Sequence, residues 1–213
     1  YNTYRKSVCD GGIKMLAYIR GKLEMKFDNY VVIDVGGLGY KVFMSEKTIE
    51  EIGNVGDIVK VHTHYHVRED DISIYGFATN DELKMFELLL GVSGIGAKSA
   101  INMLSNITPS SFALAVITND TSKLVKIPGV GAKSAARIVL ELKDKLKTIE
   151  AKQEPSVEIK EAIKEDNKLT EAISALQVLG YNRKEIEKAL EKIDKDKLSL
   201  EDIIRKGLAI LGM

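Results

Sequence analysis

Residues 91–100 read GVSGIGAKSA, and residues 126–135 read KIPGVGAKSA. Six residues return 35 positions later: Gly94, Gly96, Ala97, Lys98, Ser99 and Ala100 recur as Gly129, Gly131, Ala132, Lys133, Ser134 and Ala135. An internal repeat constrains the architecture before any other feature does. Apolar residues follow each copy at helical spacing, which predicts a helix after each glycine pair. We interpret each copy as a tight corner between two helices, with the lysine one turn into the second helix.

Such a corner is suited to binding an anion. Glycine is used where φ must be positive or where another backbone comes close. The start of a helix presents unpaired N–H groups at the positive end of the helix dipole, and this combination favours phosphate. One copy alone fits a plain turn with a solvated lysine better, whereas two copies favour a polymer with repeating phosphates.

The first copy differs from a nucleotide-binding P-loop by one residue, because Ala97 separates Gly96 from Lys98. The preceding residues 82–90 predict a helix, whereas a P-loop follows a strand. The second copy fails in the same way at Ala132. These departures argue against ATP binding by this chain.

The corner pattern is similar to the helix-hairpin-helix motif, a sequence-independent grip on the DNA backbone. Two such motifs in tandem resemble the central domain of the RuvA family, the DNA-binding subunit of the bacterial Holliday-junction branch-migration machine. On this interpretation the following residues hold one arm of a junction: Gly94, Gly96, Lys98, Ser99, Gly129, Gly131, Lys133 and Ser134.

Composition sets the wider limits. The 213 residues carry 31 basic and 31 acidic side chains, so the net charge is zero. The basic excess falls in residues 78–148, with net +3, against −1 before and −2 after this segment. The only cysteine is Cys9, which excludes a disulfide framework and a cysteine-based zinc site. No apolar run reaches membrane-spanning length and no signal peptide is recognised, so we expect a cytoplasmic protein with no membrane association and no cofactor.

The predicted fold class is multidomain β plus α. Five short strands with glycine turns predict an OB-fold barrel at the N-terminal end. A tandem helix-hairpin-helix domain, a charged flexible linker and a C-terminal three-helix, UBA-like domain with an LGY turn follow. The expected boundaries are 1–14 (an upstream extension or cloning remnant), 15–77 (barrel), 78–148 (tandem motif), 149–166 (linker) and 167–213 (three-helix domain). The RuvA family has its domains in this order.

The acidic loop Arg68-Glu69-Asp70-Asp71 is placed at the tip of a predicted strand hairpin. From the residues alone it could be a solvated turn, a metal-binding carboxylate cluster or a set of charges that repels phosphates. The family resemblance favours the third interpretation, since Glu69 and Asp70 align with an acidic pin at the centre of the junction. Asp71 is an additional acid to which no role is transferred.

His62, His64 and His66 alternate along a predicted strand, so all three would lie on one face. At about 3.3 Å per residue, the outer two are ~13 Å apart, too far to share one ion. We therefore expect no metal site. Only His64 resembles the family at these positions.

Four apolar residues of the last domain are Leu176, Leu179, Tyr181 and Leu208. Plain core packing explains some of them. The resemblance implies that they dock the RuvB ATPase motor. It also implies four-way junction DNA as the ligand, a homotetramer with an octamer left open, and the RuvC resolvase as a further candidate partner.

The main alternative is a helix-hairpin-helix nuclease or DNA glycosylase. Glu141 and Asp144 follow the second corner, but they stand among lysines on a predicted helix surface, which favours a salt-bridged face. A protein-binding adaptor is the third class, and the repeated phosphate grip disfavours it. We expect a non-catalytic DNA-binding scaffold, with ATP hydrolysis in the partner.

Overall fold

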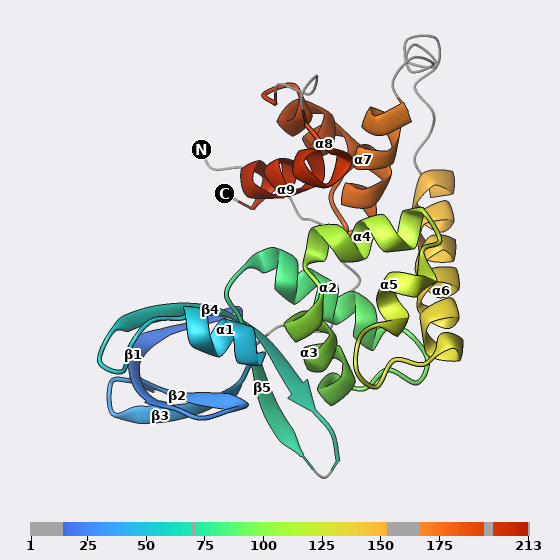
Figure 1. The fold of residues 1–213 in the computed structure, drawn as a ribbon. Helices are drawn as coiled ribbons and strands as arrows, with labels where there is room; N and C mark the ends of the chain where they lie inside the picture. Colours follow the sequence, from blue (N-terminus) through green and yellow to red (C-terminus); the bar gives the residue numbers. More distant parts are fainter. Residues whose placement is uncertain (1–14, 70, 153–166, 194–197, 213) are drawn as a thin grey trace.

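A computed structural model describes residues 15–69, 71–152, 167–193 and 198–212. Figure 1 shows a strand barrel, a group of helices beside it and a smaller helical module packed on that group. The predicted extension 1–14 and most of the predicted linker, 153–166, lie outside the described residues.

The N-terminal part is a closed five-stranded barrel, which confirms the predicted OB-like architecture. Its strands are β1 (Tyr18–Lys26), β2 (Tyr30–Val35), β3 (Leu38–Phe43), β4 (Ile58–Val67) and β5 (Ile72–Phe77). They are joined in the order β1-β2-β3-β5-β4, and β3 pairs with β5 in parallel. Alternate residues such as Val31, Ile33 and Val42 are fully buried in the barrel, as the period of two of a strand requires.

A short helix, α1 (Glu46–Glu51), connects β3 to β4 and was not foreseen from the sequence. The Ser45 hydroxyl accepts a hydrogen bond from the amide of Thr48 at 3.1 Å and caps this helix.

The central part contains α2 (Asn80–Leu90), α3 (Ala97–Asn106), α4 (Pro109–Ile117), α5 (Thr121–Val125) and α6 (Ala132–Lys152). Two predicted helix starts are confirmed: the Thr79 hydroxyl accepts from the Glu82 amide at 3.2 Å, and Pro109 opens α4. Since α6 continues to Lys152, the first four residues of the expected linker are helical.

The C-terminal module consists of α7 (Asn167–Val178), α8 (Arg183–Leu190) and α9 (Leu200–Leu211), as the three-helix prediction requires. It packs through α7 and α9 against α4 (Figure 1). One cluster of buried apolar side chains extends from Phe77, at the end of the barrel, through the central helices to Leu208 in the module. The module is therefore docked on the central helices in this structure.

No single helix in the described part of the chain is long and apolar enough to cross a membrane. Only α3 and α4 taken together, bent by 100° between them, reach that length and composition.

Candidate nucleic-acid interface

The two glycine corners have the same backbone geometry. Gly94 has φ of 84° and Gly129 has φ of 83°. In each corner the residue after this glycine donates its amide three residues back: Ile95 to Val92 at 3.1 Å, and Val130 to Ile127 at 3.0 Å. A positive φ at the third position of a four-residue turn is the type II arrangement, which favours glycine there. The 35-residue repeat is thus a repeat of conformation as well as of letters.

The helices that follow begin in the same way. The amide of Ala100 donates to Gly96 and that of Ala135 to Gly131, both at 2.9 Å. The amides before them, in the first turns of α3 and α6, have no partner within their own helix. These orphan N–H groups, together with the helix dipole, form two equivalent anion-attracting ends.

Open space lies above both corners. A Cβ atom added to Gly96, Gly129 or Gly131 would meet no atom within 4 Å, and one added to Gly94 would come within 3.4 Å only of the Arg137 guanidinium. A foreign backbone can therefore approach the corners closely.

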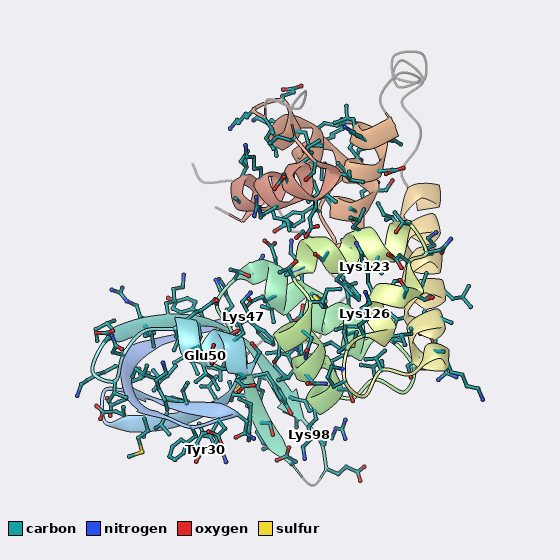
Figure 2. All side chains as sticks on the ribbon, in the orientation of Figure 1. Tyr30, Lys47, Glu50, Lys98, Lys123 and Lys126 are labelled. Atoms are coloured by element: carbon teal, nitrogen blue, oxygen red, sulfur yellow. The ribbon has the colours of Figure 1, made fainter. Side chains whose placement is uncertain are left out.

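Each corner carries a lysine at its rim. Lys98 and Lys133 are the second residues of α3 and α6, and both are exposed. Neither forms an ion pair with any residue that the structure describes. Ser99 is exposed beside Lys98, whereas Ser134 is half-buried. Figure 2 shows Lys98 at the lower end of α3, and Lys123 and Lys126 farther up at α5. Each corner therefore combines the amide groups of a helix start with one exposed cation.

Sequence reasoning overlooked two residues of this interface, Asn102 and Arg137. The Asn102 side chain donates to the carbonyl of Pro128 at 2.6 Å, and Arg137 donates to the carbonyl of Ser93 at 3.1 Å. Each contact joins the helix of one motif to the hairpin of the other. The signal was present, because Asn102 and Arg137 are 35 residues apart, but a search for identical residues passes over an Asn–Arg pair.

The acidic loop lies at the tip of the β4–β5 hairpin, which projects away from the barrel (Figure 1). The amide of Arg68 donates to the carbonyl of Asp71 at 2.8 Å and closes the turn. Glu69 is exposed, and Asp70 lies outside the described residues. The Asp71 carboxylate accepts from the Ser73 hydroxyl at 2.5 Å, so this acid is tied to its own hairpin.

The three histidines are half-buried on one side of β4. His64 Nδ1 lies 3.3 Å from a Glu87 carboxylate oxygen, and its ring packs edge-on against Phe86. Burial lowers the pKa of His62 and of His66, which favours their neutral forms at neutral pH. Among the described residues, no group of three or more potential metal ligands comes together.

The four residues assigned to motor docking are all buried in this structure: Leu176, Leu179, Tyr181 and Leu208. Tyr181 lies at the contact between the module and the central helices. Its hydroxyl donates to the Asp81 carboxylate at 2.5 Å, and the Lys84 ammonium lies 3.1 Å from its ring centroid. Burial raises the pKa of Asp81. Burial first, and then the Asp81 carboxylate, also raise the pKa of Tyr181, so its hydroxyl stays protonated.

Of the two carboxylates of the nuclease alternative, the structure describes the side chain of Glu141. Glu141 accepts a hydrogen bond from the Ser93 amide at 3.2 Å, and it is therefore engaged in holding the first hairpin. The side chain of Asp144 is outside the described residues.

Comparison with known families covers all three parts of the chain. Residues 15–76 match the RuvA N-terminal domain, 86–144 the SAM-like helix-hairpin-helix tandem and 167–212 the RuvA C-terminal domain. A protein of Acetivibrio thermocellus is 47% identical over 202 residues, covering 92% of this chain and 99% of that protein. The chain belongs to the RuvA family.

Further RuvA relatives show the same extent of similarity. A protein of Ruminiclostridium cellulolyticum is 43% identical over 203 residues, covering 92% of this chain and all of that protein. One of Clostridium perfringens is 43% identical over 201 residues, covering 92% of this chain and 99% of that protein. All three relatives carry the name Holliday junction branch migration complex subunit RuvA. The predicted family is thus confirmed along the length of the chain that these relatives cover.

Proposed function

We propose that this chain binds four-way DNA junctions and serves as the DNA-binding subunit of a branch-migration complex in recombination and repair. The observation that carries the proposal is the pair of open glycine corners with matching backbone geometry. The names of the RuvA relatives support it.

Each corner would hold one stretch of sugar-phosphate backbone. Gly94 and Gly96, like Gly129 and Gly131, let the strand come close to the orphan amides, and Lys98 and Lys133 add a point charge. Backbone amides and lysines contact phosphates, which are the same at every step of the duplex. Such contacts fix position without selecting sequence.

The acidic hairpin would work against phosphates. Glu69 is exposed at a hairpin tip that projects from the barrel, and Asp70 follows it in the sequence. At the centre of a junction, these acids would disfavour DNA states that bring phosphates onto the pin. Attraction at the corners and repulsion at the tip fit a chain whose net charge is zero.

The assembly proposed is a homotetramer, because a four-way junction presents four like arms; an octamer remains the other arrangement to measure. RuvB would supply ATP hydrolysis, and RuvC is a further candidate partner. Leu176, Leu179, Tyr181 and Leu208 are proposed to take part in docking the motor. Because they are buried here, that role requires a rearrangement of the module.

A gel shift of four-way against linear DNA tests the proposal. We expect a tight complex with the junction, equal affinity for junctions of different sequence, and a mass that corresponds to four or eight chains. Equal binding to linear and four-way DNA would contradict junction recognition. The same mixture with Mg²⁺ tests the nuclease alternative, which predicts cut strands, whereas a scaffold leaves them intact.

A further inference from the structure

The two hairpins are held by each other's helices. Asn102 on α3 donates to the carbonyl of Pro128 in the second hairpin, and Arg137 on α6 donates to the carbonyl of Ser93 in the first. Ser93 and Pro128 are 35 residues apart, as are Asn102 and Arg137. The same contact is therefore made twice in opposite directions, once by a neutral amide and once by a guanidinium.

We propose that Asn102 and Arg137 are positioning residues, each of which orients the phosphate-gripping hairpin of the opposite motif. The inference deepens the proposed DNA binding and rests on it for its importance. It explains how the two glycine hairpins keep a fixed orientation relative to each other. This requires contacts between the two motifs, in addition to the repeated sequence within each.

The contacted carbonyls explain how the orientation is imposed. The carbonyl of Ser93 belongs to the same peptide unit as the amide of Gly94, and that of Pro128 to the same unit as the amide of Gly129. A peptide unit is planar and trans, so its N–H points opposite to its C=O. A donor that fixes the carbonyl on the side of the opposing helix turns the glycine amide away from that helix. The contact thus directs the glycine N–H away from the opposing helix. At Gly129 the surroundings are also open, since a Cβ there would meet no atom within 4 Å.

The surroundings of Arg137 support a holding role. Glu141, one turn farther along α6, accepts a hydrogen bond from the Ser93 amide at 3.2 Å. The same helix therefore binds both the amide and the carbonyl of Ser93. The position equivalent to Arg137 is Asn102, which cannot pair with a phosphate by charge. Contact with the hairpin carbonyl, rather than positive charge, is therefore what the two positions share.

Amide resonances of the ¹⁵N-labelled full chain without DNA test the crossed geometry. Leucine at position 102 keeps roughly the size of asparagine and removes the donor. We expect Asn102→Leu to shift the amides of Gly129 and Gly131 more than those of Gly94 and Gly96. Arg137→Leu should show the reverse pattern. Shifts confined to the hairpin of each residue's own motif would overturn the inference, whether or not the chain binds DNA.

Double-mutant cycles with a four-way junction give the functional readout. Each leucine variant should weaken binding about three- to tenfold, the range expected for one hydrogen bond. Asn102→Leu combined with Lys133→Ala should weaken binding by less than the product of the two single effects, since both act on the second corner. In the double variant Asn102→Leu with Lys98→Ala, the weakening of binding should equal the product of the two single effects to within about twofold, although Lys98 is on the same helix as Asn102. The opposite pairing would contradict the crossed geometry.

A conservative variant separates positioning by Arg137 from direct phosphate binding. Arg137→Gln keeps an amide donor, as in Asn102, but loses the charge. We expect it to bind several-fold better than Arg137→Leu and to keep the wild-type salt dependence. Lys22→Ala, which removes an exposed cation on β1 that pairs with Glu24, is the matched control for charge alone. If Arg137→Gln and Arg137→Leu are equally weak and both flatten the salt slope by about one unit, Arg137 is a phosphate ligand and the inference fails for it.

The two proposals fail separately. A wild-type chain that does not prefer junctions contradicts the proposed function, while the amide shifts still decide the bracing. A chain that binds junctions but shows no crossed amide shifts supports the proposed function and contradicts the positioning role of Asn102 and Arg137.

Discussion

At the residue scale, each glycine corner combines two separate requirements. Gly94 and Gly129 need a positive φ, which side chains with a Cβ adopt at a cost. Gly96 and Gly131 have no positive φ, so the open space beside them is the only one of the two requirements that applies to them. Substitutions at the two glycines of a pair can therefore separate backbone conformation from clearance.

Alanine substitutions in the second corner should show this separation. Gly129→Ala should lower the free energy of unfolding by about 1–2 kcal/mol, since φ there is 83°. Gly131→Ala should change it by no more than about 1 kcal/mol. It should nevertheless weaken junction binding, because the methyl group stands where the strand would approach. Thermal unfolding and gel shifts on both variants check the prediction, and normal junction binding by Gly131→Ala would contradict it.

Lysine replacement tests the charge at the corners. Lys98→Ala together with Lys133→Ala should weaken binding to all junction sequences alike. The slope of log K against log salt should fall by about one unit for each lost phosphate contact. A titration at several salt concentrations, with Lys22→Ala as the control, provides the measurement. An effect that differs between junction sequences would indicate base contacts instead.

At the scale of elements, the β4–β5 hairpin carries acids away from the barrel, whereas α3 and α6 carry lysines at their starts. Surface charges act over about 8–10 Å at physiological salt. The negative charge of the hairpin tip and the positive charge at the helix starts therefore each act on nearby groups, even though the net charge of the chain is zero. On the proposed function, the hairpin would discriminate among DNA shapes rather than add affinity.

Neutralising the hairpin should change discrimination. Glu69→Gln with Asp70→Asn should raise the affinity for linear duplex by about two- to fivefold, the range of one or two surface charge contacts. Preference for the four-way junction should fall accordingly. Competition between labelled junction and unlabelled duplex measures the ratio. A loss of affinity for both DNAs would show that these acids hold structure instead of repelling phosphates.

The sequence predicted the elements that carry their own local signals. The corners were identifiable because glycine and lysine recur at one spacing, and the strands because their apolar residues alternate. The short helix α1 has only six residues and one capping serine, too little for a periodic pattern. Docking of α7 and α9 on α4 depends on side chains far apart in the chain, which no local pattern reports. The crossed contacts of Asn102 and Arg137 were missed for another reason: the two residues have the 35-residue spacing of the repeat but are not identical.

At the scale of the whole molecule, the C-terminal module is held on the central helices through both apolar and polar contacts. The Tyr181 hydroxyl donates to Asp81, and the Ser111 hydroxyl donates to Glu201 at 2.5 Å. Of the residues proposed for motor docking, Tyr181 is covered at this contact, whereas Leu176 is buried against Gly207 within the module itself. If the motor binds Tyr181, docking competes with the motor, and the apparent affinity is the intrinsic affinity multiplied by the fraction of chains that are undocked.

Weakening the polar contact should therefore favour the motor. Asp81→Ala removes the acceptor and leaves the Tyr181 hydroxyl without its partner, a change that costs about 1–3 kcal/mol when a group is buried. We expect tighter RuvB binding and faster hydrogen exchange at the start of α2, with junction binding retained. Asp81→Asn keeps an acceptor oxygen and should have a smaller effect. Unchanged RuvB affinity in Asp81→Ala, despite faster exchange, would mean that docking does not limit the motor.

The pH dependence of stability should carry the signature of Asp81. Burial raises its pKa in the folded chain, so the folded state binds this proton more tightly than the unfolded state does. The stability associated with the protonated carboxyl is complete below the unfolded pKa and is lost as pH rises through the raised pKa. Relative to Asp81→Asn, the wild-type chain should therefore become less stable as the pH rises above about 4. Melting temperatures of the pair across this range give the difference, and a difference that does not vary with pH would contradict the burial of this charge.

The reciprocal contacts of Asn102 and Arg137 have a consequence for modularity. If the hairpin of each motif is held by a side chain of the other, neither motif could be excised or grafted alone and keep its conformation. A peptide of one motif would have the complete motif sequence but a poorly ordered hairpin. The two motifs then function only as a pair, and a substitution at position 102 or 137 would alter the hairpin of the opposite motif.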